Sequence, residues 1–249
     1  MAQMDETTTQ LVAQYQTPES VIERLRSVKA VILTGITAAG KDTIMNDMLD
    51  DGRFVKVITS TTRDPRANNG IMEQDGVDYY FLTIEQAAQK IKDGEYIEVA
   101  NVHGRIYGSL VAEYERINTD GKIAMSNVDY QGAVNFLNFA MPDLLVLFVV
   151  PPSFEVWIER LTGRSGGSLG GNKEDIINRF RSAEKELAHA LNDPRFVPVM
   201  NFNSDDTAKE IIDYAANGTS PTPESINQAH QVIKDLSKSI TDYIAQLET

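Results

Sequence analysis

The 249-residue sequence predicts an α/β fold in which a mainly parallel sheet is flanked by helices. Short apolar runs typical of buried strands alternate along the chain with stretches of helical periodicity. The run at 144–150, L-L-V-L-F-V-V, lacks polar alternation, so we expect a central parallel strand that is buried on both faces. A glycine-containing loop at 35–43 joins the apolar run 31–33 to a helix, as in strand–loop–helix units.

The composition is that of an ordinary globular protein and limits the possible functions. Hydrophobic residues make up 42% of the chain and charged residues 24%. The net charge of −13 argues against nonspecific binding of nucleic acid or of an anionic membrane, because both require a basic face. The sequence contains no cysteine, which excludes disulfides and thiolate metal sites. It shows neither a long apolar run nor a signal-peptide pattern, so we expect a cytoplasmic protein.

Residues 1–28 are expected to form a helical extension ahead of the first strand. Residues 1–10 are polar, and we expect them to be frayed. The sequence T-P-E-S at 17–20 predicts a helix start with Thr17 as the N-cap and Pro18 at the first helical position. The same four residues recur at 222–225, ahead of an amphipathic helix predicted over 224–247.

The loop at 35–43, G-I-T-A-A-G-K-D-T, has the G-x-x-x-x-G-K spacing of a phosphate-binding loop. Its two glycines let successive backbone N–H groups point at one anion, and Lys41 can reach the outer phosphates of a nucleotide. Asp42 stands where Ser or Thr usually touches Mg²⁺, and Thr43 follows one position late. The predicted phosphate-binding residues are Gly35, Ile36, Thr37, Ala38, Ala39, Gly40, Lys41, Asp42 and Thr43.

Two features downstream of this loop suggest a second ligand site. Arg63 and Arg66 lie three positions apart in a segment broken by Pro65, which suits a two-sided grip on phosphate. The alternative is a pair of solvated surface arginines. Glu98 lies in the apolar strand predicted over 96–100, where a carboxylate is costly unless it is paired or bound to a ligand.

The remaining elements complete the alternation of strands and helices. A helix predicted over 155–161 leads toward Arg160 and Arg164, four positions apart, and a glycine-rich hinge is expected at 165–171. The apolar stripe of the last helix is expected either to pack on its own domain or to form a dimer or partner interface. Further strands are predicted over 54–58, 77–81, 123–128 and 197–200, and further helices over 43–49, 84–92, 110–117, 131–139, 176–191 and 207–216.

Seven motifs follow the phosphate loop in a characteristic order: T-S-T-T-R-D-P-R, D-G-V-D-Y-Y-F, Y-I-E-V-A, Y-G-S, N-V-D-Y-Q-G, V-P-P-S and R-L-T-G-R. Together they resemble the guanylate kinase family over about residues 29–215. The resemblance implies a P-loop NTPase-type parallel sheet with a small mixed GMP-binding subdomain at about 59–110 and a mobile lid at about 160–180. It places the domain at 29–216, between the extension at 1–28 and a linker and C-terminal helix at 217–249.

The resemblance also implies a reaction, which is Mg²⁺-assisted transfer of the γ-phosphoryl group of ATP to GMP or dGMP. Catalytic charge would come from Lys41, Arg63, Arg160 and Arg179. ATP would be bound by the loop at 35–43 with Arg160, Arg164 and Asn201, and Mg²⁺ by Asp42 and Thr43. GMP would be bound by Thr59, Arg63, Arg66, Tyr79, Glu98, Tyr107, Ser109 and Asp129. The carboxylate of Glu98 would read guanine, whose N1–H and N2–H₂ donors lie side by side.

Three departures from the family pattern leave alternatives open. Asn127 replaces the first acid of the usual D-x-D motif, and we hypothesise that Asp42 supplies the missing charge. The segments 67–74 and 165–173 are longer than usual. The alternatives are a guanylate kinase-like protein-binding module and a kinase with another acceptor, such as a ribose phosphate. The chain is expected to be a monomer or a homodimer formed through its last helix.

Overall fold

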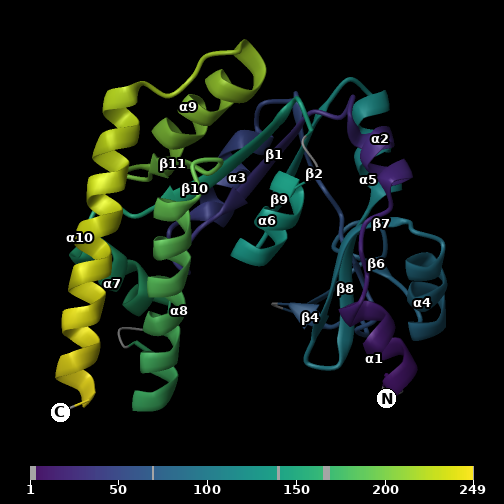
Figure 1. The fold of residues 1–249 in the computed structure, drawn as a ribbon, viewed down its shortest axis with the longest axis horizontal. Helices are drawn as coiled ribbons and strands as arrows, with labels where there is room; N and C mark the ends of the chain where they lie inside the picture. The colour runs from purple at the N-terminus through teal and green to yellow at the C-terminus, as the bar shows by residue number, and fades with distance from the viewer. Residues whose placement is uncertain (1–3, 69, 139–140, 165–168, 249) are drawn as a thin grey trace. The chain divides into compact units, whose positions relative to one another are not determined.

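Figure 1 shows the computed structural model, which describes residues 4–68, 70–138, 141–164 and 169–248. The side chains of Asn68 and Arg164 lie outside the described part. The chain divides into two compact units, each described below by itself. Unit 1 comprises Met1–Lys29, Val55–Ala124 and Asn138–Leu144, and unit 2 comprises Ala30–Phe54, Met125–Leu137 and Leu145–Thr249.

The central sheet, most of which belongs to unit 2, confirms the predicted fold class. Its five strands follow the order β11 (Val197–Met200), β10 (Leu144–Val150), β1 (Ala30–Thr34), β9 (Ile123–Asn127) and β2 (Phe54–Lys56). Strands β10 and β11 run parallel, with Phe148 opposite Pro198. All five residues of β1 and the last five of β10 are buried, as expected for a sheet that is covered on both faces.

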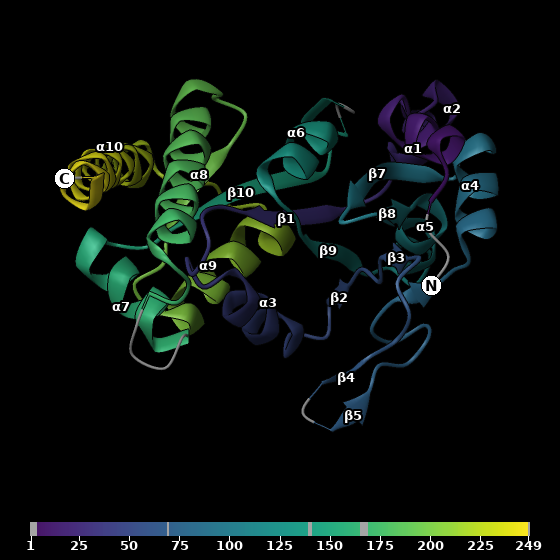
Figure 2. The same ribbon diagram turned by 90° about the horizontal axis from the view of Figure 1, so that it is seen from below.

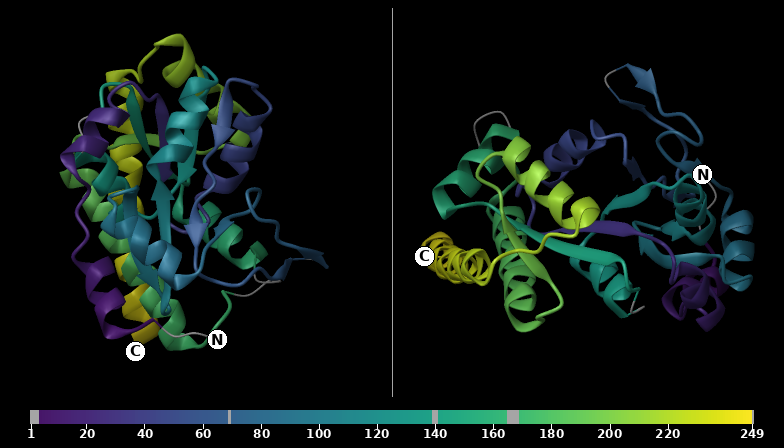
Figure 3. Two further views of the ribbon diagram at one scale, coloured as in Figure 1. Left: turned by 90° about the vertical axis from the view of Figure 1, so that its right-hand side faces the viewer. Right: turned by 90° about the horizontal axis from the view of Figure 1, so that it is seen from above.

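Six helices surround this sheet in the described part of unit 2. Helices α6 and α8 cover one face, and α3 and α9 cover the other (Figures 2 and 3). Helix α10 packs against α8, β11 and α7, so its apolar stripe is buried within its own unit. The bounds are α3 (Lys41–Leu49), α6 (Tyr130–Asn138), α7 (Phe154–Arg164), α8 (Lys173–Asn192), α9 (Ser204–Asn217) and α10 (Pro223–Glu248).

Unit 1 contains a small mixed sheet. Its order is β6 (Tyr80–Phe81), β3 (Ser60–Thr61), β8 (Arg105–Leu110) and β7 (Tyr96–Val102). Strand β3 is parallel to β6 and antiparallel to β8, which is in turn antiparallel to β7. A short hairpin, β4 (Ala67–Asn68) and β5 (Ile71–Met72), extends the loop that follows β3. Helices α4 (Ile84–Lys92) and α5 (Val111–Thr119) complete the unit together with two N-terminal helices.

The N-terminal segment corrects two predictions. Residues 6–10, predicted to be frayed, belong to helix α1 (Glu6–Ala13), which Asp5 caps by accepting a hydrogen bond from the N–H of Thr8 at 2.7 Å. Val12 is buried in the core of unit 1. This tertiary contact stabilises the helix although the local sequence is polar. In helix α2 (Glu19–Leu25) the N-cap position is occupied by Pro18, not by Thr17, and no side chain caps the helix. The hydroxyl of Thr17 instead donates to the carbonyl of Ile97 at 2.6 Å.

Among the described helices, none is both long and apolar enough to cross a lipid bilayer. Helix α10 is the longest of them, and its buried residues lie on one side. The stripe consists of the buried residues Ala229, Ile233, Leu236, Ile240 and Ile244.

Candidate active site

The phosphate-binding loop lies between β1 and α3, and both of its glycines are required by the backbone. Gly35 has φ of 131°, and a Cβ there would lie 2.3 Å from the carbonyl oxygen of Val149 in β10. Gly40 has φ of 98°, and a Cβ there would lie 2.2 Å from Nδ2 of Asn201. Side chains at either position would therefore clash and be strained. Because both residues are glycine, the loop can pass close to β10 and to Asn201, which follows β11.

Lys41 occupies the first turn of α3 and folds back over the loop. Its Nζ donates to the carbonyl oxygens of Gly35 at 2.6 Å and Ile36 at 3.2 Å. The ammonium group is therefore held at the mouth of the loop, beside the backbone N–H groups that would meet an anion. The role predicted for Lys41 at the outer phosphates stays a prediction.

Arg160 and Asn201, two of the residues predicted to bind ATP, both contact the same loop. Arg160, from α7, donates to the carbonyl of Ala39 at 3.2 Å and to that of Asn201 at 2.9 Å. The amide of Asn201 also donates to Ala39 O, at 2.8 Å. Burial lowers the pKa of Arg160, against the opposing charge of Glu159. The guanidinium still stays charged at neutral pH, because an arginine pKa is far above 7.

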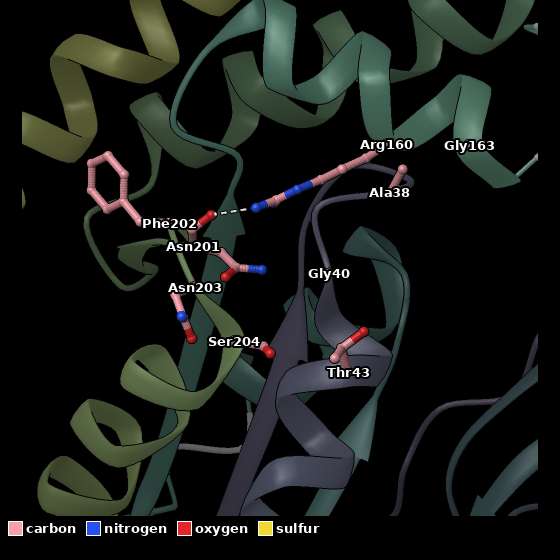
Figure 4. Close-up of a pocket in the computed structure, with 9 residues that line it drawn as sticks. All are labelled: Ala38, Gly40, Thr43, Arg160, Gly163, Asn201, Phe202, Asn203 and Ser204. Atoms are coloured by element: carbon pink, nitrogen blue, oxygen red, sulfur yellow. Dashed lines mark hydrogen bonds between the residues drawn. The ribbon is translucent and has the colours of Figure 1, made fainter. Parts of the chain in front are cut away.

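These residues line a cavity of about 390 Å³ (Figure 4). Figure 4 shows Arg160 reaching from α7 toward the end of β11. A cavity of this size can hold a large part of a nucleotide. It is lined by Ala38, Gly40, Thr43, Arg160, Gly163, Asn201, Phe202, Asn203 and Ser204.

Asp42 and Asn127 are in direct contact. Nδ2 of Asn127, at the end of β9, donates to Oδ1 of Asp42 at 2.6 Å. In the described part of the chain, no group of three or more His, Cys, Asp or Glu side chains gathers as a metal cluster. The carboxylate of Asp42 and the hydroxyl of Thr43 are nevertheless hard oxygen donors of the kind that suit Mg²⁺.

Three further predicted residues, Arg179, Asp129 and Arg164, come from the second half of the chain. Arg179, from α8, donates to the carbonyl of Leu169 at 2.7 Å. Asp129 belongs to unit 2, and its Oδ1 accepts a hydrogen bond from the N–H of Gly132 at 2.8 Å, at the start of α6. Its predicted contact with GMP stays a prediction. The side chain of Arg164 and the glycines Gly166 and Gly167 lie outside the described part of the chain.

Unit 1 brings together Arg63 and two of the predicted tyrosines. Nε of Arg63 donates to the hydroxyl of Tyr107 at 3.2 Å. The guanidinium carbon lies 5.1 Å from the ring centroid of Tyr79 and 5.7 Å from that of Phe81. The rings of Tyr79 and Tyr107 contact each other edge to face, with centroids 6.1 Å apart. A cation and two phenol groups thus form one cluster that suits an anionic ligand.

Glu73 is a further member of this cluster that the sequence pattern does not indicate. Its carboxylate accepts two hydrogen bonds from Arg63, at 2.6 and 3.0 Å, and one from the backbone N–H of Arg66 at 3.0 Å. The side chains of Arg63 and Glu73 are each 13% exposed. The hydrogen bonds from Arg63 lower the pKa of Glu73, and those to Glu73 raise the pKa of Arg63. Glu73 follows the β4–β5 hairpin, within the segment 67–74 whose sequence predicts only a longer loop.

Glu98 and Ser109 face each other in the pair formed by β7 and β8. The hydroxyl of Ser109 donates to Oε1 of Glu98 at 2.7 Å, and Ser109 is fully buried. The hydrogen bond from Ser109 therefore explains how the apolar strand can hold the carboxylate of Glu98, which would be costly there without a partner. Thr59 precedes β3, and its carbonyl accepts a hydrogen bond from the N–H of Tyr80 at 2.9 Å.

The predicted residues therefore fall into two groups. Unit 2 holds the loop at 35–43 with Arg160 and Asn201, and unit 1 holds the Arg63 cluster with the Glu98–Ser109 pair. Arg66 joins the unit 1 group through its backbone, while its side chain is exposed.

Comparison with known proteins matches most of the chain to one family. The model of the Guanylate kinase family matches residues 27–217. The guanylate kinase of Clostridium perfringens is 33% identical over 183 residues, which cover 73% of this chain and 79% of the relative. That of Corynebacterium glutamicum is 34% identical over 189 residues, which cover 74% and 93%.

A solved structure agrees with the sequence comparisons. The crystal structure of guanylate kinase from Anaplasma phagocytophilum matches with a TM-score of 0.54 and 26% identity, and the match covers 78% of this chain and 87% of that one. The family model covers more than half of the chain, and the two bacterial relatives are more than 30% identical to it over about three quarters of its length. The chain therefore belongs to the guanylate kinase family, a family of nucleoside monophosphate kinases.

Proposed function

We propose that this protein transfers the γ-phosphoryl group of ATP to GMP, giving ADP and GDP. The observation that carries the proposal is the Arg63–Tyr79–Tyr107 cluster, which lies on the same small sheet as the Glu98–Ser109 pair. The cluster suits the phosphate of an acceptor, and the carboxylate suits the adjacent N–H donors of guanine. Family membership supports the same reaction.

The donor half of the reaction is assigned to unit 2. Backbone N–H groups of the loop at 35–43 would surround the ATP phosphates, and Lys41 would exchange its bonds to Gly35 and Ile36 for the outer phosphate oxygens. Arg160 would keep its position beside the loop through the carbonyl of Ala39. The cavity between the loop and Asn201 would receive the adenosine end of ATP.

The transfer step depends mainly on position and charge. Phosphoryl transfer needs the attacking and leaving oxygens in line, with cations around the moving group. Lys41 and Arg160 would supply charge on the donor side, Arg63 would supply it on the acceptor side, and Arg179 would reach the moving group. When bound, Mg²⁺ would neutralise phosphate charge, and Asp42 and Thr43 are the residues proposed to hold it.

Selectivity for guanine is assigned to Glu98. Its carboxylate accepts from Ser109 through one oxygen, and a carboxylate has further lone pairs to accept from N1–H and N2–H₂ of guanine. Adenine lacks this donor pair, so it would not replace the hydrogen bonds from N1–H and N2–H₂, which is costly at a partly buried position. The proposed acceptor residues address the phosphate and the base, so we expect dGMP to be accepted as well.

A coupled assay of ADP release tests this proposal. The acceptors to compare are GMP, dGMP, AMP, UMP and a ribose phosphate, each at saturating ATP and Mg²⁺. We expect turnover with GMP and dGMP and little with the others. Turnover confined to the ribose phosphate would support a kinase with another acceptor. No turnover with any acceptor would support a protein-binding module.

A further inference from the structure

The C-terminal helix α10 lies outside the residues that the family model matches, 27–217, yet it packs on the donor half of the protein. Its buried apolar stripe contacts α8, β11 and α7. Figure 1 shows it running alongside α8. Helices α7 and α8 carry Arg160 and Arg179, so α10 supports two elements that bear proposed donor-site cations.

A continuous chain of aromatic rings leads from α10 into this unit. The ring of Tyr243 stacks on that of Phe180 in α8, with centroids 5.1 Å apart and an angle of 20°. Phe180 in turn packs on Trp157 in α7, with centroids 4.9 Å apart. Phe154 contacts all three rings at 5.7 to 6.4 Å. Phe180 and Trp157 are fully buried, so their positions are fixed by the packing around them.

The chain ends on the phosphate-binding loop. The indole N–H of Trp157 donates to the carbonyl oxygen of Thr37, in the middle of the loop, at 2.7 Å. Three residues further along α7, Arg160 donates to the carbonyl of Ala39. Because a peptide group is planar, a carbonyl held at Thr37 also sets the direction of the N–H of the next residue. The indole thus fixes the orientation of a backbone N–H that would face the ATP phosphates.

We infer that Tyr243 is a positioning residue for the donor nucleotide, acting through Phe180 and Trp157 on the carbonyl of Thr37. The inference rests on the proposed role of this loop in binding ATP. Polar contacts also tie α10 to α8, including an ion pair between Arg181 and Glu248 at 2.5 Å and a hydrogen bond between Thr241 and Glu184. These side chains are exposed, and such surface contacts contribute little, so the coupling is carried by the aromatic chain, in which Phe180 and Trp157 are fully buried.

Binding of MgATP measured by titration calorimetry tests the inference without requiring turnover. The variant Tyr243→Ala removes the ring, Tyr243→Phe keeps it, and Ile233→Ala removes a buried side chain of α10 that is not part of the aromatic chain. We expect Tyr243→Ala to raise the Kd for ATP about fivefold to tenfold, as for other remote displacements of binding groups. Tyr243→Phe should stay within about twofold, and Ile233→Ala should lower the melting temperature with little change in Kd.

Trp157 supplies an independent readout, because it is the only tryptophan in the sequence. Its fluorescence should change when ATP binds to the wild-type protein, and this change should be smaller in Tyr243→Ala. In calorimetry, Trp157→Phe should raise the Kd for ATP. The Kd of the double variant with Tyr243→Ala should not exceed the higher of the two single-variant values, since both substitutions act through one contact.

Three outcomes would overturn the inference. The first is wild-type ATP affinity in a folded Tyr243→Ala variant, and the second is an equal loss of affinity in Ile233→Ala, which would indicate a general effect of stability. The third is absence of ATP binding to the wild-type protein, which would also remove the donor half of the proposed function. In contrast, ATP binding that depends on Tyr243 without any phosphorylation of GMP would support the inference and contradict the proposed reaction alone.

Discussion

The side-chain amide of Asn127 donates a hydrogen bond to the carboxylate of Asp42 across 2.6 Å. The two residues come from the end of β9 and the first turn of α3, 85 positions apart in the sequence. Their contact supports the hypothesis, drawn from the sequence, that Asp42 supplies the negative charge that is missing at Asn127. Asp42 also lies at a helix N-terminus, where a negative charge is favourable.

The exchange can be tested with two variants. In Asp42→Ser the site loses its carboxylate, so we expect the Mg²⁺ concentration for half-maximal activity to rise about fivefold to tenfold. In Asp42→Ser combined with Asn127→Asp the carboxylate returns at the other position, and the Mg²⁺ requirement should return toward that of the wild type. Binding of Mn²⁺ to the ATP complex, followed by electron paramagnetic resonance, gives a measure that is independent of turnover. Failure of the double variant to recover would count against the exchange.

The contact between Glu73 and Arg63 predicts an effect on the acceptor alone. Glu73→Gln keeps the size of the side chain but cannot accept both guanidinium hydrogen bonds, so Arg63 loses its fixed orientation. We expect the KM for GMP to rise about fivefold, with the KM for ATP unchanged.

A matched control for Glu73 is present in the same unit. Glu115 accepts two hydrogen bonds from Arg24, at 2.7 and 2.6 Å, in an exposed pair outside the Arg63 cluster. Glu115→Gln should leave both KM values unchanged. If Glu73→Gln instead lowered the KM for GMP, Glu73 would be a competitor of the acceptor phosphate and not a support for Arg63.

Glu98 is the residue that we propose reads the base of the acceptor nucleotide. Glu98→Gln replaces one acceptor oxygen by a donor that faces the N–H groups of guanine, so kcat/KM for GMP should fall about 100-fold. Turnover with AMP should change far less, so the ratio of kcat/KM for GMP to that for AMP should decrease. Ser109→Ala, which removes only the hydroxyl that donates to Glu98, should have a smaller effect in the same assay. Equal losses for GMP and AMP would show that Glu98 supports the fold and does not read the base.

Glu113 links the stability of unit 1 to pH. Burial alone would raise the pKa of Glu113, but hydrogen bonds from Arg116, Tyr80 and the N–H of Ile58 outweigh it and lower this pKa below the ordinary value of 4.5. A carboxyl group with a lowered pKa in the folded state contributes stability above the unfolded-state pKa and loses that contribution as pH falls through the folded-state pKa. The free energy of unfolding should therefore decrease as pH falls below 4.5.

Urea unfolding at a series of pH values checks this expectation. In Glu113→Gln the group cannot titrate, so the variant should be less stable than the wild type at pH 7, and the difference should shrink below pH 4.5. Curves that stay parallel through this range would assign the acid sensitivity to other carboxyl groups.

The sequence predicted those parts of the fold that depend on local pattern. Strand β10 has the bounds that were expected, since a continuous apolar run can be satisfied only in a buried strand. The phosphate loop was also recognisable, because Gly35 and Gly40 meet backbone requirements that few other residues can satisfy.

Features that depend on distant contacts could not be predicted in the same way. Helix α1 is held by Val12 and by the hydroxyl of Tyr15, which donates to the carbonyl of Tyr96 at 2.6 Å, a residue 81 positions away. The contact of Trp157 with Thr37 joins residues 120 positions apart. Glu73 reaches Arg63 only because the β4–β5 hairpin reverses the chain between them. None of these pairs leaves a periodic signal in the sequence.

The most direct test of the proposed reaction follows the transferred group itself. The protein is incubated with ATP labelled at the γ-phosphate, GMP and Mg²⁺, and the labelled products are separated by chromatography. We expect the label to appear in GDP, in amounts equal to the ADP formed. Label released as inorganic phosphate, or label that remains in ATP while GMP is unchanged, would contradict the assignment of GMP as the phosphoryl acceptor.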